Sequence, residues 1–332
     1  MEHPFAKFIQ ILGKGQRGAR DLTQQEANLA MSMIMTGQVE PVQLGAFLML
    51  MRVKEETPEE VAGFAQAVRS YIVRPANHAT VDLDWASYAG KRRQLPWYLL
   101  SALLLSSYGI RVLMHGMGSG IKDRIFIPQA MQALELKPAG SLEEASAQIA
   151  KSNFSFIPLQ ALNRDLDLML GLKSLLGLRS PIHTVIRMLN PLGAQTSMMG
   201  IFHPGYDATH QRAAALMGDH SLAVFKGEGG EAERNPDASC NVNFLLDGTL
   251  LDEEWPPLFC NKHLKDETMD VSRLAKFWRG EIEDEYAAAS VQGTAAIALR
   301  ALGRAQSISE ATAQAARLWS TRDIGYLERI TD

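Results

Sequence analysis

The chain has 332 residues, of which 46% are hydrophobic and 21% charged, and its formal net charge is −4. These values are typical of a folded globular protein with a sizeable core, and they exclude the disordered and fibrous classes. Only two cysteines, Cys240 and Cys260, are present, so we expect no disulfide framework and a reducing, cytoplasmic location.

The first 73 residues are predicted to form a small helical domain. Thr23 and Glu26 have the spacing of a capping box, in which each residue satisfies a free backbone N–H of the other at the start of a helix. Thr57-Pro58 begins another helix, with proline at its first position. A stripe of methionines is expected either in the core or on a surface that faces a second subunit, because methionine fills irregular apolar gaps. The stripe consists of Met31, Met33, Met35, Met49 and Met51.

After residue 75, short apolar runs alternate with helical stretches. The runs predicted as strands are Ile110–Met114, Phe154–Pro158, Thr196–Phe202 and Leu222–Lys226. This alternation is typical of an α/β fold, here a large domain with a mostly parallel sheet flanked by helices. We expect the large domain to comprise residues 80–160 and 191–332, and helices of about 162–190 to join the small helical domain.

No membrane association is expected. The longest apolar run, 95–105, is too short to cross a bilayer. The first ten residues also lack the pattern of a signal peptide.

The segment 111–124, RVLMHGMGSGIKDR, looks like a phosphate-binding loop. Three glycines within five residues would let backbone N–H groups approach an anion, and Lys122 and Arg124 add positive charge beside them. The only nearby carboxylate is Asp123, so the segment lacks the ligands of a catalytic metal. A plain strand-to-helix turn is the alternative.

Positive charge collects in the middle of the chain. Residues 91–124 contain six basic residues and one acid, a local balance of +5, whereas the acids gather in other stretches. The net charge argues weakly against a nucleic-acid binder, but the distribution of charge matters more. A basic middle between acidic ends makes a polarised molecule.

The run 21–68, DLTQQEANLAMSMIMTGQVEPVQLGAFLMLMRVKEETPEEVAGFAQAV, closely resembles the start of anthranilate phosphoribosyltransferase. Further matches follow in family order: His115-Gly116 with Ser119, Leu176–Arg179, Asn190-Pro191 and the Gly227–Gly230 turn. The resemblance covers nearly the whole chain. It implies the fold shared with the pyrimidine nucleoside phosphorylases, and a homodimer joined through the helical part.

The residues that carry the chemistry of this family are replaced. Its first glycine-rich loop corresponds to Ser87–Gly90, where a single glycine and Tyr88 leave no cradle for pyrophosphate. Met117 replaces the asparagine of the family's HGN motif, and 124–129 (RIFIPQ) replaces its SGSAD segment. Where an Asp-Glu pair holds Mg²⁺ in the family, this chain has Ala232 and only the relic Glu233.

These losses lead us to expect no catalytic residue, no metal and no cofactor. The pattern is similar to the YbiB-like branch of the family, as are His183, Thr184 and Arg187. The resemblance implies a non-enzymatic protein that binds nucleic acid, DNA or RNA, with little sequence preference on a homodimeric scaffold. The alternative is a phosphoribosyltransferase or nucleoside phosphorylase-type enzyme with an atypical acceptor, which would require Mg²⁺.

The residues expected to contact nucleic acid or phosphate are Lys91, Arg92, Arg93, His115, Gly116, Ser119, Lys122, Arg124, Arg179, Arg187 and Lys226. Structural alternatives stay open for several of them. Lys91–Arg93 is either a phosphate-contacting rim or a solvated turn, and Arg179 either meets a ligand or forms a salt bridge at a helix end. His115 is either a ligand contact or a turn histidine with its hydrogen bonds satisfied. Asn190 is expected to hold its loop in place.

Overall fold

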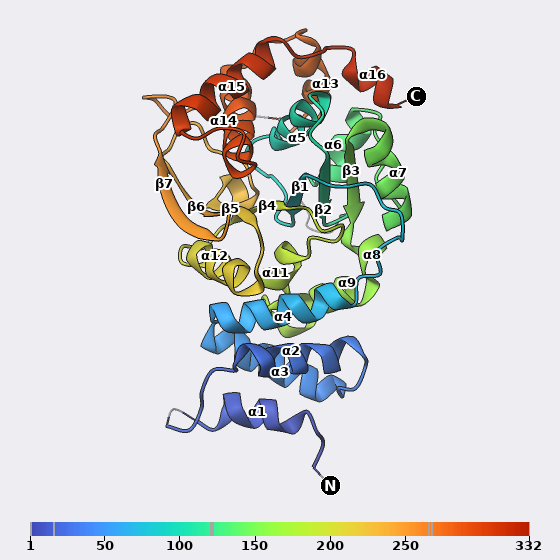
Figure 1. Cartoon of the computed structure of the whole chain (residues 1–332), viewed down its shortest axis with the longest axis vertical. Helices are drawn as coiled ribbons and strands as arrows, with labels where there is room; N and C mark the ends of the chain where they lie inside the picture. Colours follow the sequence, from blue (N-terminus) through green and yellow to red (C-terminus); the bar gives the residue numbers. More distant parts are fainter. Residues whose placement is uncertain (1, 16, 120–122, 265, 267, 332) are drawn as a thin grey trace.

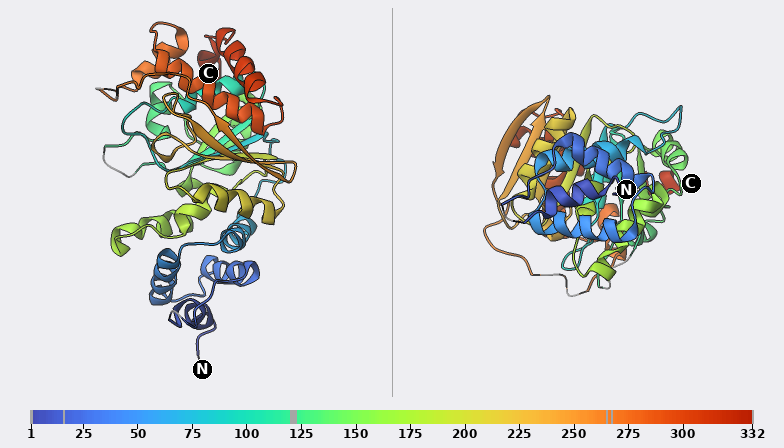
Figure 2. Two further views of the ribbon diagram at one scale, coloured as in Figure 1. Left: turned by 90° about the vertical axis from the view of Figure 1, so that its left-hand side faces the viewer. Right: turned by 90° about the horizontal axis from the view of Figure 1, so that it is seen from below.

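The computed structural model describes residues 2–15, 17–119, 123–264, 266 and 268–331, and it shows a block of helices beneath a larger α/β part (Figure 1). The block contains α1 (Ala6–Gly13), α2 (Gln24–Met35), α3 (Pro41–Lys54) and α4 (Pro58–Ser70). The short helices α8 (Leu159–Leu162), α9 (Arg164–Gly171), α10 (Lys173–Leu176) and α11 (Ile182–Val185) lie near the junction of the two parts. Figure 2 shows the helical block projecting from one end of the molecule. The predicted fold class is confirmed.

The described part of the sheet has the strand order β3-β2-β1-β4-β5-β6-β7. The strands are β1 (Leu83–Ser87), β2 (Val112–Gly116), β3 (Phe154–Pro158), β4 (Thr196–Ile201), β5 (Ser221–Lys226), β6 (Cys240–Leu246) and β7 (Thr249–Trp255). The first five are parallel, and β6 and β7 extend the sheet in antiparallel register.

The four predicted strands are present, with small shifts at their ends, but three strands were not predicted. Asp84 and Ser87 interrupt the apolar run of β1, so its sequence lacks a strand pattern although the strand is central and fully buried. The edge strand β7 contains three consecutive acids and is largely exposed, so it reads as a solvated loop.

Helices cover both faces of the sheet. Over one face lie α5 (Tyr98–Ser107), α6 (Ile127–Ala133), α13 (Ser272–Arg279), α14 (Glu285–Ala301), α15 (Ile308–Ser320) and α16 (Tyr326–Thr331). The other face packs against α7 (Leu142–Ser152), α12 (Tyr206–Met217) and the helices at the junction. Successive residues of β1 serve the two faces, since Trp85 belongs to the first core and Ala86 to the second.

The second core continues without a break from the sheet into the helical block, from Phe5 to Leu245. The methionine stripe belongs to this core, because Met31, Met33 and Met51 are buried within it. Met35 and Met49 are only partly buried against this core, so for them a surface that faces a second subunit stays a prediction. Among the described residues, no helix combines the length and the apolar character needed to cross a bilayer.

The start of α2 is built as predicted. The Thr23 hydroxyl accepts from the Glu26 backbone N–H, and the Thr23 N–H donates to the Glu26 carboxylate at 2.9 Å. Thr57 and Glu60 form the same box at the start of α4. Helices α2 and α4 then pack very closely, because Gly63 has no side chain: a Cβ there would lie 2.3 Å from the Gln24 carbonyl oxygen.

Candidate functional site

A cavity of about 320 Å³ lies where the helical block meets the carboxyl end of β4. Ligands of open α/β sheets bind at such strand ends. The cavity is lined by Arg52, Glu55, Glu56, Arg179, Ser180, His183, Thr184, Arg187, Ile201, Phe202, His203, Pro204, Tyr206 and His210.

The cavity and its mouth are rich in arginine. Burial lowers the pKa of the Arg179 guanidinium, and the positive charges of Arg124 and Arg52 nearby lower it further. Within the described ranges, none of these three side chains forms an ion pair with a carboxylate. Glu55 and Glu56 also line the cavity, and the charge of Arg52 acts on Glu56. Because no carboxylate of the described residues holds any of the three guanidinium groups directly, an anion beside them is still favoured. The salt-bridge alternative for Arg179 is not observed.

The remaining polar groups of the cavity are largely neutral or satisfied. Burial, with Arg179 and Arg187, lowers the pKa of the His183 imidazole to about 3, so this ring is neutral at physiological pH. Arg187 donates from Nε to the Gly200 carbonyl at 3.0 Å and also contacts the His183 carbonyl. On the acidic side, burial raises the pKa of Glu56, whose carboxylate accepts a 3.0 Å hydrogen bond from the Tyr206 hydroxyl.

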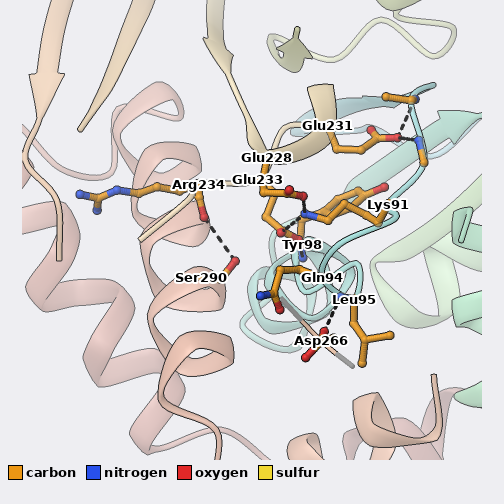
Figure 3. Close-up of polar contacts among 12 residues, drawn as sticks. Lys91, Gln94, Leu95, Tyr98, Glu228, Glu231, Glu233, Arg234, Asp266 and Ser290 are labelled. Carbon is orange, nitrogen blue, oxygen red and sulfur yellow. Dashed lines mark hydrogen bonds and ion pairs between the residues drawn. The ribbon is translucent and has the colours of Figure 1, made fainter. Parts of the chain in front are cut away.

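The loop after β1 departs most from what the sequence suggested. Lys91 does not lie on an exposed rim with Arg92 and Arg93: it is fully buried and forms ion pairs with Glu228 and Glu233 (Figure 3). Two carboxylates from a turn distant in the sequence draw this ammonium inward. The expectation that Lys91 contacts a ligand phosphate is therefore corrected.

The other two residues of the triplet, Arg92 and Arg93, are exposed as expected. Arg124 is half-buried and faces inward, where it donates to the carbonyl oxygens of Ala89 and Gly90 at 2.6 and 3.1 Å. It thus stabilises the loop after β1 from one side. Its charge still acts on the cavity, through Arg179.

The residues of the glycine-rich segment are separated in the structure. His115 and Gly116 end β2 and are buried, and a Cβ on Gly116 would lie 1.9 Å from the Ser87 carbonyl oxygen. The His115 ring is hydrogen-bonded to the Tyr88 hydroxyl at 2.7 Å and lies 3.4 Å from Asp84. Both residues therefore serve strand packing, and their expected phosphate contact is corrected to an internal role. Ser119 is exposed, and Lys122 lies outside the described residues.

Two further expectations concern single residues. Lys226 is exposed at the end of β5, as a phosphate contact requires. Asn190 holds its loop through two hydrogen bonds to Ala194, from its side-chain amide to the carbonyl at 2.8 Å and from the Ala194 N–H to its side-chain oxygen at 2.7 Å. The structural role expected for Asn190 is confirmed.

The family's Mg²⁺ does not fit the residues present. One carboxylate oxygen of Glu233 contacts the Lys91 ammonium and the other accepts from the Tyr98 N–H at 2.9 Å. Ala232 offers no ligand atom, and the described residues contain no group of three potential metal-binding side chains. Mg²⁺ requires several free hard oxygens, and here both oxygens of Glu233 already have partners.

The sequence did not indicate several residues of the site. Arg52 lies on a helix of the distant N-terminal block and reaches the cavity only through the packing of that block. Tyr206 and Glu56 likewise meet across the cavity from separate parts of the chain. The Gly-Gly turn before Glu231 was the only local signal near the buried carboxylates.

Residues 6–72 match the model of the glycosyl transferase family, helical bundle domain. An uncharacterized protein, YbiB of Escherichia coli, is 25% identical over 245 residues, which cover 73% of this chain and 76% of that protein. Anthranilate phosphoribosyltransferase of Burkholderia cenocepacia is 26% identical over 303 residues, 88% of this chain and 87% of the enzyme. The structure of anthranilate phosphoribosyltransferase from Saccharomyces cerevisiae in complex with PRPP and Mg has the same fold. It aligns with a TM-score of 0.79 over 100% of this chain and 98% of that one, at 14% identity.

Proposed function

The chain belongs to the anthranilate phosphoribosyltransferase-like glycosyl transferase family. We propose that it uses this scaffold, as a homodimer, to bind nucleic acid at the arginine-rich cavity. We propose that this binding needs no divalent metal. The proposal differs from the activity of the named relatives because the site has no free carboxylate oxygens at Glu233 to hold a metal.

The observation that carries the proposal is the cluster of Arg52, Arg124 and Arg179, which has no carboxylate partner among the described residues. Phosphate groups would neutralise this charge and release counterions. Arg92 and Arg93, which are exposed in the loop that follows Lys91, would offer two further contacts for phosphate groups. Contacts of this kind are made to the backbone of a nucleic acid, so binding would tolerate many sequences.

Phe202 adds one feature suited to a single strand. The residue is 54% exposed and lines the cavity, where an unpaired base could stack on its ring. Base stacking does not depend on sequence. We therefore expect single strands to bind at least as well as duplexes.

The second candidate is a transferase with an atypical acceptor. The Burkholderia relative and the Saccharomyces structure support this candidate more directly than they support nucleic-acid binding. The cavity near Arg179 has room for a small acceptor. Against it stands the closed arrangement at Lys91 and Glu233, which leaves the Mg²⁺ of PRPP without ligands.

Fluorescence titration of the full-length chain with labelled single- and double-stranded oligonucleotides at graded salt tests the first candidate. We expect binding that weakens steeply with salt and is at least as strong in EDTA as in Mg²⁺, which competes for the phosphates as a counterion. Incubation with PRPP, Mg²⁺ and anthranilate tests the second, and we expect no product. Metal-dependent product, or oligonucleotide binding that is absent at low salt, would reverse the assignment.

Substitution of the exposed arginines sharpens the test. Arg92→Ala/Arg93→Ala is expected to reduce the slope of log affinity against log salt by about two units, one for each phosphate that no longer meets an arginine. Arg317→Ala removes an equally exposed arginine from α15, which lies at the far end of the molecule from the helical block, and serves as the matched control. Equal slopes for both variants would show that Arg92 and Arg93 are only solvated.

A further inference from the structure

Two segments meet at the carboxyl ends of β1 and β5. One is the loop Ala89–Lys91, which follows β1, and the other is the turn 227–233, which follows β5. Figure 3 shows Glu231 and Lys91 reaching between them. This edge of a parallel sheet is where α/β folds hold anionic ligands, so the groups that occupy it determine what it can bind.

The carboxylate of Glu231 occupies an anion site made of backbone. It accepts hydrogen bonds from two successive N–H groups, those of Ala89 at 2.7 Å and Gly90 at 2.6 Å, and it is buried. Successive N–H groups on a loop form the concave arrangement that binds phosphate oxygens in other proteins. Here both donors are already used by a side chain of the same molecule.

Two glycines create the space for Glu231. A Cβ on Gly227 would lie 1.7 Å from the Glu231 carbonyl oxygen, and one on Gly200 would lie 2.2 Å from its carbonyl carbon. The backbone of Glu231 is therefore held against two other segments. Its carboxylate is part of the packed structure and does not swing freely in solvent.

The ammonium of Lys91 occupies the neighbouring cation position. It is fully buried and forms ion pairs with Glu228 and Glu233. Although burial disfavours the charged form, the two carboxylates outweigh it and hold the pKa of Lys91 above its usual value. Two carboxylates that face one position could hold a divalent cation. Here the ammonium of Lys91 occupies that position.

We infer that Glu231 and Lys91 are resident replacements for a bound phosphate group and its divalent cation, so that this strand-end site is closed to metal–pyrophosphate ligands. The inference rests on two neighbouring arrangements: the Glu231 carboxylate accepts from two backbone N–H groups, and the Lys91 ammonium pairs with two carboxylates. It does not depend on nucleic-acid binding, because it concerns only the ions that the loop and turn accept. Ligand phosphates would then meet the protein at basic side chains outside this site.

Manganese ion is the probe, because free Mn²⁺ is counted directly by electron paramagnetic resonance. The full-length wild-type chain is expected to bind no Mn²⁺ at this site. Lys91→Met, which keeps the bulk of the side chain and removes its charge, leaves the carboxylates of Glu228 and Glu233 without their cation and is expected to bind Mn²⁺ at least about tenfold more tightly than wild type. Lys91→Met/Glu233→Gln is the matched control, and it should lose that gain.

A second arm tests the anion position. In the presence of Mn²⁺, Lys91→Met/Glu231→Ala is expected to bind inorganic pyrophosphate more tightly than Lys91→Met alone, because the N–H groups of Ala89 and Gly90 are released. Equal affinities of the two variants for pyrophosphate would overturn the assignment of Glu231.

Wild-type protein that binds Mn²⁺, and loses it on Glu233→Gln, would show that Glu233 is a working metal ligand and would overturn the inference. So would a folded Lys91→Met that gains no Mn²⁺. If Lys91→Met does not fold, we expect either Mn²⁺ or the added Glu233→Gln change to restore folding, since Mn²⁺ would pair both carboxylates and Glu233→Gln removes the charge of the fully buried one. Failure of both rescues would contradict the inference too.

Discussion

Arg69 on α4 and Asp219, just after α12, form a two-pronged ion pair that joins the helical block to the α/β part. The guanidinium nitrogens lie 2.6 and 2.9 Å from the two carboxylate oxygens, and Arg69 also donates from Nε to the Met188 carbonyl at 2.7 Å. Both side chains are largely buried. Such a planar pair orients two elements as well as attracting them.

We predict that Arg69→Met lowers the free energy of unfolding by about 2 kcal/mol, because it leaves the carboxylate of Asp219 partly buried and unpaired. Urea denaturation measures the loss. Asp219→Asn and the double variant complete a mutant cycle. The double variant should be less destabilised than the sum of the single changes, and strict additivity would show that the pair contributes no coupling.

The close packing of α2 and α4 gives a second prediction. Gly63→Ala places a methyl group 2.3 Å from the Gln24 carbonyl oxygen and should destabilise the chain by about 1–3 kcal/mol, as overpacking does. Gly45, in the interior of α3, has open space around it and provides the control. Gly45→Ala should raise stability by about 0.5–1 kcal/mol, because alanine favours helices. Similar effects at both positions would contradict the close approach.

His210 predicts a dependence of stability on pH. Burial lowers the pKa of its imidazole to about 4, although the Tyr206 carbonyl, 2.6 Å from Nδ1, opposes the shift. Between pH 6.5 and 4 the unfolded chain binds a proton that the folded chain does not, so stability falls as pH falls through this window. The full contribution is about 3 kcal/mol.

We therefore expect His210→Gln to flatten the decline of stability between pH 7 and pH 4, measured by urea denaturation at each pH. His220→Gln, at an exposed histidine whose ring lies 3.2 Å from Asp247, provides the comparison with a surface histidine. A profile for His210→Gln that parallels wild type would exclude His210 as the source.

The proposed homodimer is tested through apolar side chains that the helical block and the junction leave exposed. Val42, Val53 and Leu175, each about four-fifths exposed, are the side chains that we expect in the contact surface. We expect a dimer in sedimentation at micromolar concentration and a monomer for Val42→Glu/Leu175→Glu. Leu250→Glu, on the exposed edge strand, should stay dimeric. A wild-type monomer would contradict the proposal.

Local sequence determined the secondary structure wherever a short pattern sets the backbone. The Thr23 and Glu26 capping box, the strand Phe154–Pro158 and the loop held by Asn190 all depend on residues close together in the chain. The apolar periodicity of the N-terminal helices and the strand-helix alternation after them likewise determined the fold class. Each of these features is encoded within a few turns of chain.

Tertiary structure alone decided which basic side chains are buried in ion pairs and which stay exposed. Lys91, Arg92 and Arg93 are alike in sequence, yet Lys91 is buried because Glu233, 142 residues away, lies beside it. Arg52 reaches Arg179 only because the helical block packs against the junction helices. Charged side chains carry no periodic signal of their partners, and an ion pair becomes favourable only when the fold has brought both groups out of water together.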